Sequence, residues 1–398
     1  MRWLIRILIL SLFLIPTTRS SAQSDSLVSN VTLTYEFGNA INVSAEILNA
    51  KNYSAFTLIL RPDGQSSRQI ELHPDADGKG IVRYDLKQDP LKPFARIYYW
   101  FEFENLDKTS STSPSYWFDY LDNRFLWKSN ESNLFQISWV EGDTSYGQKL
   151  QDIAREGFIK ATQILPVAPE LPIRIYVYPG IEKMQEAIAL TNQSWAAGHS
   201  SPDIGVILVS NGSPPAKLIE MERQIPHELM HILQYQIAGA QYRNIPVWLS
   251  EGLATYAEIY PDPDLERVLN ESYESGNLIL FESLCSGFSQ DAATAQLGYA
   301  QSVSFVNYLN GRFGSEFFPE LIENSKSGQN CTNSIESVLH ISLAQLQKDW
   351  QEITFAQKNG TELNNVYILV IICVAVIGLV GTILIIRSKS KKTISRYE

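Results

Sequence analysis

The protein has 398 residues, of which 44% are hydrophobic and 19% are charged, a composition typical of a folded chain and not of a disordered one. It carries 32 Lys and Arg residues against 43 Asp and Glu residues, so its formal net charge is −11. Eight of the basic residues lie in the terminal segments 1–22 and 387–398, and the body between them is therefore strongly acidic. Such a body would repel a phosphate backbone, which excludes nucleic-acid binding.

The first 22 residues have the layout of a secretory signal peptide. Arg2 and Arg6 precede an apolar run over 7–15, and a stretch of small residues then ends at Ala22. The apolar run is too short to cross a bilayer as a helix. We therefore expect residues 1–22 to be a signal peptide, cleaved after Ala22.

Residues 26–122 alternate between apolar and polar side chains, which predicts short β-strands. Turn sequences such as Pro62-Asp63-Gly64 separate the alternating runs. About seven strands at this spacing are typical of an immunoglobulin- or fibronectin-like β-sandwich. Because this region has no cluster of catalytic or metal-binding residue types, we expect a structural or spacer domain. The strands are expected at 31–37, 41–47, 56–61, 69–72, 81–84, 96–104 and 115–120.

Residues 123–357 mix strand and helix signals and are predicted to form a second domain of the α+β class, mostly helical. Strands are expected at 135–140, 173–178 and 204–210, and amphipathic helices around 150–164 and 184–190. The pattern from Glu220 onward is helical. Cys285 and Cys331 could form one disulfide in an oxidising compartment, a point that depends on their Cα separation.

The C-terminal region has the pattern of a membrane anchor. After a short polar tether at 358–365, residues 366–386 contain no charge, and 21 residues are enough to span the hydrocarbon core as a helix. The basic tail 387–398 follows directly, which favours a cytoplasmic C-terminus. We therefore expect a single-pass type I protein of the cell membrane with an extracytoplasmic body. The alternative, a buried helix of a globular domain, is disfavoured because nothing else in the chain could cover it.

A His-Glu-x-x-His motif occupies residues 227–231. Residues four apart share one face of a helix, so the imidazoles of His227 and His231 can reach the same metal ion. Glu228 then lies beside the metal, where a general base for a metal-bound water must be. Pro226 is best tolerated in the first turn of a helix, so we expect this helix to begin there.

A catalytic zinc ion takes three protein ligands and keeps one open position. After His231 the chain has a helix-length stretch, a loop that ends at Pro246, and a second helix that contains Glu251, 20 positions after His231. A returning antiparallel helix would bring Glu251 back beside the two histidines. The sequence therefore predicts a metal site made of His227, His231 and Glu251.

This signature, completed by Glu251-Gly252, resembles that of the gluzincin branch of zinc metallopeptidases, to which thermolysin belongs. The sequence around the motif is most similar to that of the peptidase MA-like bacterial metallohydrolases, over about 135–354. The resemblance implies a zincin-like fold, one Zn²⁺ per chain on the three ligands, and Glu228 as the base that activates the zinc-bound water. Thermolysin-like members place an Asp four residues after the ligand Glu. Here that position is Thr255, and Glu258 could replace it.

The oxyanion that develops during peptide hydrolysis needs a hydrogen-bond donor besides the metal. Tyr299 is the first candidate, although it could equally be a packing residue, and His199 is the second. A Gly-Ala-Met-Glu-Asn motif, which holds the substrate amino terminus in related aminopeptidases, does not occur, which favours an endopeptidase.

The sequence therefore indicates a membrane-anchored, extracytoplasmic zinc peptidase that acts on peptides or proteins. The alternative is a non-catalytic surface binding or adhesion protein that uses the β-sandwich, with the peptidase-like domain as a platform.

Overall fold

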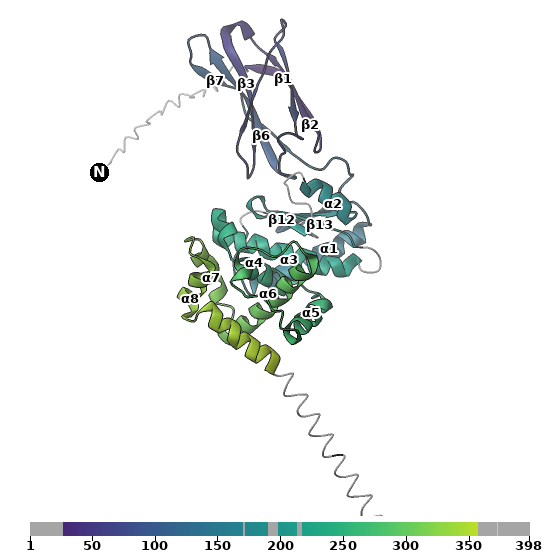
Figure 1. Ribbon diagram of the computed structural model, residues 1–398. Helices are drawn as coiled ribbons and strands as arrows, with labels where there is room; N and C mark the ends of the chain where they lie inside the picture. The colour runs from purple at the N-terminus through teal and green to yellow at the C-terminus, as the bar shows by residue number, and fades with distance from the viewer. Residues whose placement is uncertain (1–26, 170–171, 190–197, 213–216, 357–371, 373–398) are drawn as a thin grey trace, which may run out of the picture. The chain divides into compact units, whose positions relative to one another are not determined.

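The computed structural model describes residues 27–169, 172–189, 198–212, 217–356 and 372. Contacts within the chain divide it into two units, Met1–Arg124 and Phe125–Glu398 (Figure 1). The first unit is rich in β-strands. The second begins with a mixed sheet and continues as a largely helical region.

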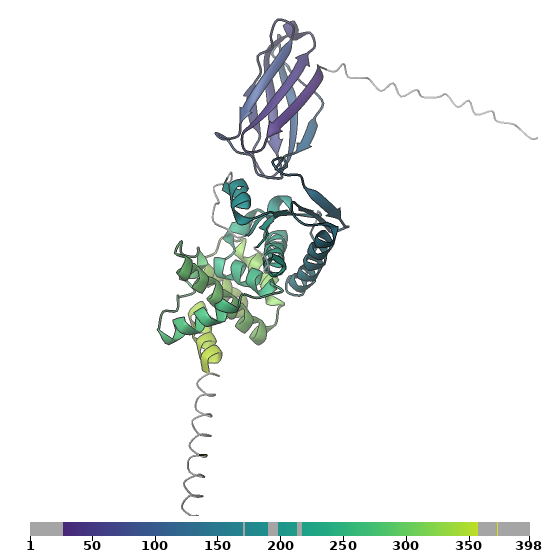
Figure 2. The same ribbon diagram turned by 90° about the vertical axis from the view of Figure 1, so that its right-hand side faces the viewer.

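The first unit contains two antiparallel sheets, which appear as two layers of strands in Figure 2. One sheet has the order β1-β2-β5, and the other has the order β4-β3-β6-β7 with β8 also paired to β6. The strands are β1 (Val28–Glu36), β2 (Ala40–Ile47), β3 (Tyr53–Pro62), β4 (Arg68–Glu71), β5 (Lys79–Asp85), β6 (Arg96–Asn105), β7 (Ser110–Thr112) and β8 (Tyr116–Asp119).

The alternating sequence of β6 explains its place in this unit. The alternate residues Ile97, Tyr99, Phe101 and Phe103 are buried, while the residues between them are partly exposed, because successive side chains of a strand point to opposite faces. Phe37, directly after β1, stacks on Tyr120, directly after β8, with ring centroids 5.0 Å apart. This aromatic contact joins the end of the β1 sheet to the end of the β6 sheet.

The second unit opens with a five-stranded sheet of order β12-β13-β11-β10-β9. The three central strands are parallel, and β9 and β12 pair antiparallel at the two edges. Buried apolar side chains of β10, β11 and β13 pack against helices α1 and α3 in one core. The elements are β9 (Lys128–Glu131), β10 (Phe135–Trp139), α1 (Thr144–Thr162), β11 (Ile173–Tyr178), α2 (Ile181–Ile188), β12 (Gly198–Ser201), β13 (Val206–Ser210) and α3 (Lys217–Ala238).

The helical region that follows packs around a second apolar core, which includes Trp248, Phe281, Phe305 and Trp350. Cys285 and Cys331 form a disulfide with their Cα atoms 6.0 Å apart, which ties the segment before α6 to the start of α8. The elements are η4 (Gly239–Asn244), α4 (Val247–Ala257), α5 (Pro263–Glu274), η5 (Ser283–Cys285), α6 (Ala292–Phe313), α7 (Phe317–Ser325) and α8 (Cys331–Leu339).

The prediction that helix α3 begins at Pro226 was wrong. The helix starts at Lys217, so Pro226 lies in its interior. A proline there removes the hydrogen bond to the carbonyl four residues earlier. That carbonyl, of Glu222, instead accepts the backbone N–H of Ile259 at 2.9 Å. The proline is tolerated because a distant segment satisfies the group that it leaves free.

The prediction of a transmembrane helix is also corrected. Within the part of the chain that the structure describes, no helix combines the length and apolar character needed to cross a bilayer. This finding contradicts the expected span at 366–386 and the single-pass membrane localisation that depended on it. The prediction used only the length and hydropathy of one run, of which Ile372 alone is described. The expected signal peptide 1–22, tether 358–365 and tail 387–398 lie outside the described residues.

Candidate metal centre

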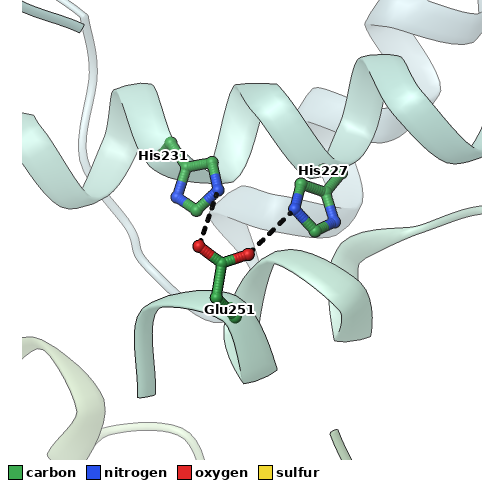
Figure 3. A group of neighbouring side chains, drawn as sticks. All are labelled: His227, His231 and Glu251. Atoms are coloured by element: carbon green, nitrogen blue, oxygen red, sulfur yellow. Dashed lines mark ion pairs between the residues drawn. The ribbon is translucent and has the colours of Figure 1, made fainter. Parts of the chain in front are cut away.

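Two antiparallel helices carry the candidate ligands. Helix α3 presents His227 and His231 one turn apart on the same face, and α4 returns alongside it with Glu251 in its second turn (Figure 3). The reversal takes place in η4, whose first residue, Gly239, has φ +58°, a left-handed conformation that suits glycine at a helix end. Apolar residues of α3 and α4 share the helical core, which fixes their approach.

The three side chains converge on one point. One ligand atom from each of His227, His231 and Glu251 lies within 4.8 Å of the other two. The Nε2 atom of His227 lies 3.4 Å from Glu251 Oε2, and the Nε2 atom of His231 lies 3.8 Å from Glu251 Oε1 (Figure 3). The sequence-predicted trio is therefore brought together by the fold.

These distances fit a shared cation better than direct pairing. A good N–H···O hydrogen bond spans about 2.7–3.2 Å, which is shorter than both separations. Two ligands about 2.0–2.1 Å from one zinc ion at a tetrahedral angle would be about 3.4 Å apart. Two imidazoles and one carboxylate are also a ligand set that zinc accepts. The cluster can therefore hold a metal ion.

A carboxylate contacts the ring nitrogen of His227 that faces away from the metal cluster. Glu258, just after α4, is buried and places Oε1 3.1 Å from Nδ1 of His227. Arg223 lies on its other side, with Nε 3.9 Å from Glu258 Oε2. Thr255, at the position where thermolysin-like sequences have an Asp, has a buried hydroxyl without a hydrogen-bond partner. Glu258 thus contacts the histidine, whereas the Thr255 hydroxyl makes no hydrogen bond to it.

The site has a strongly negative environment. Burial lowers the pKa of His227, but the carboxylates of Glu251 and Glu258 outweigh it and raise the pKa to about 10. Burial raises the pKa of Glu251, and the charges of His231 and His227 reverse that effect and leave it below its ordinary value. Glu228 also contributes negative charge near His227. Three carboxylates around two imidazoles favour a bound cation.

Glu228 faces the edge of the sheet. Its side chain is only 6% exposed and lies against Gly198, the first residue of the edge strand β12. A Cβ atom at Gly198 would be 2.7 Å from Glu228 Oε1, so a larger residue would collide with the carboxylate. Local sequence patterns carry no signal for this contact, because about 30 residues separate the two positions.

The two candidate oxyanion donors differ in their placement. Tyr299, on α6, has its ring centroid 6.4 Å from that of His227, and its hydroxyl interacts with the Glu251 carboxylate. Burial and the nearby carboxylates raise the pKa of Tyr299 above its ordinary value, so the hydroxyl keeps its proton. Phe288 supports the ring edge-on at 4.8 Å. His199 lies on the edge strand β12, opposite Leu208 of β13.

A residue that the sequence analysis missed contacts His231. Tyr242, in η4, places its hydroxyl 3.0 Å from His231 Nδ1. Its only sequence signal is a position 11 residues after the histidine, which suggests nothing without knowledge of the turn.

The comparisons with solved structures give weak likenesses. An aminopeptidase N family protein from Idiomarina loihiensis is 10% identical, with a TM-score of 0.36, over 80% of this chain and 75% of that one. A carbohydrate-binding module family 56 beta-1,3-glucan binding domain is 11% identical, with a TM-score of 0.16, over 23% of this chain and 99% of that one. A structure described as a myokine is 18% identical, with a TM-score of 0.19, over 24% and 97%. The comparison with curated proteins finds no match.

The family comparison is more decisive. The model of the Peptidase MA superfamily matches residues 153–356, just over half of the chain. The matched range contains α3 and α4, and with them the three converging ligands and Glu228. The chain belongs to the Peptidase MA superfamily.

Proposed function

We propose that this protein is a zinc-dependent peptidase of the gluzincin type. The observation that carries the proposal is the convergence of His227, His231 and Glu251 within 4.8 Å, with Glu228 on the same helix as the two histidines. These three residues would hold the ion through Nε2 of each histidine and the carboxylate of Glu251. Zinc, when bound, polarises a carbonyl group and lowers the pKa of a coordinated water.

Glu228 acts as the general base and acid. It takes a proton from the attacking water and returns that proton to the leaving amine, a role that needs a carboxylate beside the metal ligands. Its burial and its contact with Gly198 restrict the directions in which it can point. A restricted carboxylate is better suited to proton transfer than one that swings freely.

Tyr299 supplies the hydrogen bond to the developing oxyanion. Its proton is retained at neutral pH, and its hydroxyl is already close to Glu251. β12 is an edge strand of the described sheet, and an extended peptide can pair with an edge strand, which suits binding of an internal stretch of the substrate chain. With no Gly-Ala-Met-Glu-Asn sequence to hold an amino terminus, we assign endopeptidase activity.

The test is Glu228→Gln, assayed on a mixed peptide library with zinc content measured on the same preparation. We expect turnover to fall about 10²–10⁴-fold while zinc remains bound, because the amide cannot accept the proton. Glu222→Gln is the matched control, since Glu222 lies six residues earlier on α3 and is not a member of the metal cluster. Unchanged turnover in Glu228→Gln would remove Glu228 from this role.

The same experiment separates the enzyme from a binding protein. Chelator-sensitive cleavage by the unaltered chain supports the peptidase. Stoichiometric zinc with no cleavage of any library peptide would refute peptidase activity, and it would favour the alternative in which the chain is a non-catalytic surface binding protein.

A further inference from the structure

To bind a metal ion, the ring of His231 must be held in one orientation. We propose that Tyr242 is a positioning residue for His231, acting with Ser250 and Gln234 as a neutral hydrogen-bond network. The inference rests on the metal site of the proposed function. It concerns three residues that touch none of the reacting groups.

The direction of the hydrogen bond follows from the geometry. The Nε2 atom of His231 faces Glu251, so Nε2 must be the metal-binding atom and must carry no proton. The proton of the neutral imidazole is then on Nδ1, which needs an acceptor. The Tyr242 oxygen is 3.0 Å from Nδ1, and it is the only one of the three surrounding oxygens within the usual hydrogen-bond range.

The other two oxygens belong to Ser250 and Gln234, and each lies 3.4 Å from Nδ1. The Ser250 hydroxyl donates to Oε1 of Gln234 at 2.7 Å, and Nε2 of Gln234 donates to the Ser250 carbonyl at 2.9 Å. These two bonds fix which end of the Gln234 amide faces the histidine. Because Gln234 is fully buried, the arrangement is shielded from water.

The two histidines are therefore oriented by different chemistry. His227 Nδ1 lies 3.1 Å from a carboxylate oxygen of Glu258, whereas the oxygens described around His231 Nδ1 belong to two hydroxyl groups and an amide. A partner on the second ring nitrogen fixes the tautomer and the ring orientation of a metal ligand, and its loss typically weakens metal binding 10–100-fold. Tyr242→Phe removes one oxygen from this network and keeps the ring that packs against His231.

The experiment measures the zinc dissociation constant of the full chain by competition with a chromophoric chelator at one pH. We expect zinc to bind Tyr242→Phe about 10–100-fold more weakly than the unaltered chain. Tyr235→Phe is the matched control, since Tyr235 packs against Tyr242 with ring centroids 6.1 Å apart and does not contact His231 in the described structure. We expect its zinc affinity to change less than about twofold.

A second measurement does not depend on any variant folding. The chain has only five histidines, so selective ¹⁵N labelling of the imidazoles gives a readable spectrum of the zinc-loaded protein. We expect a protected Nδ1–H signal from His231 in the unaltered chain. If His231 carries its proton on Nε2, or if Tyr242→Phe keeps the full zinc affinity, the inference is overturned. Failure of the unaltered chain to bind zinc would instead overturn the proposed function, and this inference with it.

Discussion

Replacing Gly198 with alanine should impair catalysis without disturbing the metal ligands. The added Cβ atom would lie 2.7 Å from Oε1 of Glu228, and 3.2 and 3.3 Å from its Cγ and Cδ atoms. The collision is with the far end of a flexible side chain, so the carboxylate can turn away without a backbone shift. Gly198 also lies in a strand, where alanine is permitted. We therefore expect the free energy of unfolding to change by less than about 1 kcal/mol.

The size of the catalytic effect follows from the same distances. Ordinary van der Waals contact begins at about 3.4 Å, so Oε1 of Glu228 must move by at least about 0.7 Å. A displacement of about 1 Å in a reacting group can lower the rate about 10²-fold. We therefore expect kcat to fall about 10–100-fold, with zinc affinity unchanged because no ligand moves.

The assay compares kcat, KM, zinc content and thermal unfolding for the unaltered chain, Gly198→Ala and Gly180→Ala. Gly180 is a suitable control because nothing lies within 4 Å of its added Cβ atom and its φ of −178° is ordinary extended backbone. If Gly198→Ala keeps its kcat within about threefold, the carboxylate position is not critical and the reasoning fails. Loss of zinc in this variant would also refute it.

Three further predictions concern stability. Replacing Cys331 with serine removes the bond to Cys285, and for a sequence separation of 46 loop-closure entropy predicts a loss of about 4 kcal/mol in chemical unfolding of the second unit. Gly252→Ala places a Cβ atom 2.7 Å from a backbone carbonyl of α6, which should lower the free energy of unfolding by about 1–3 kcal/mol in thermal melts. Arg68 holds the pKa of Asp89 below its ordinary value by hydrogen bonding. The stabilisation by the Arg68–Asp89 pair is therefore present above the unfolded-state Asp pKa of about 3.9. It is lost as the pH falls through the lowered pKa of Asp89 in the folded state. Asp89→Asn should cost at most about 1 kcal/mol at pH 7, and less as the pH approaches 2 in urea titrations.

The parts of the site that the sequence could predict are those set by local geometry. The spacing of His227 and His231 guarantees a shared face on any helix. Glu251 required one further assumption, that the chain reverses direction between the two helices, and the loop before Pro246 made that assumption reasonable. The strand alternation in β6 likewise depends only on neighbouring residues.

Contacts between distant residues were not predictable in this way. Gly198 looks like any loop glycine until β12 is paired with β13 at the sheet edge and α3 packs beneath it. Tyr242 lies in a 3₁₀ turn whose direction the sequence does not specify. The expected span at 366–386 is contradicted by the finding that no helix among the described residues is long and apolar enough to cross a bilayer.

Pro226 shows how an apparent defect in a helix can contribute to the site. Because the proline has no N–H, the Glu222 carbonyl is free to accept the backbone N–H of Ile259 at 2.9 Å. Ile259 directly follows Glu258, whose carboxylate contacts His227 at 3.1 Å. The carbonyl that α3 leaves unpaired therefore accepts a hydrogen bond from the segment that follows α4, and this bond holds that segment beside His227. An N–H at position 226 would compete for that carbonyl, so the proline and the position of the Glu258 carboxylate are physically linked.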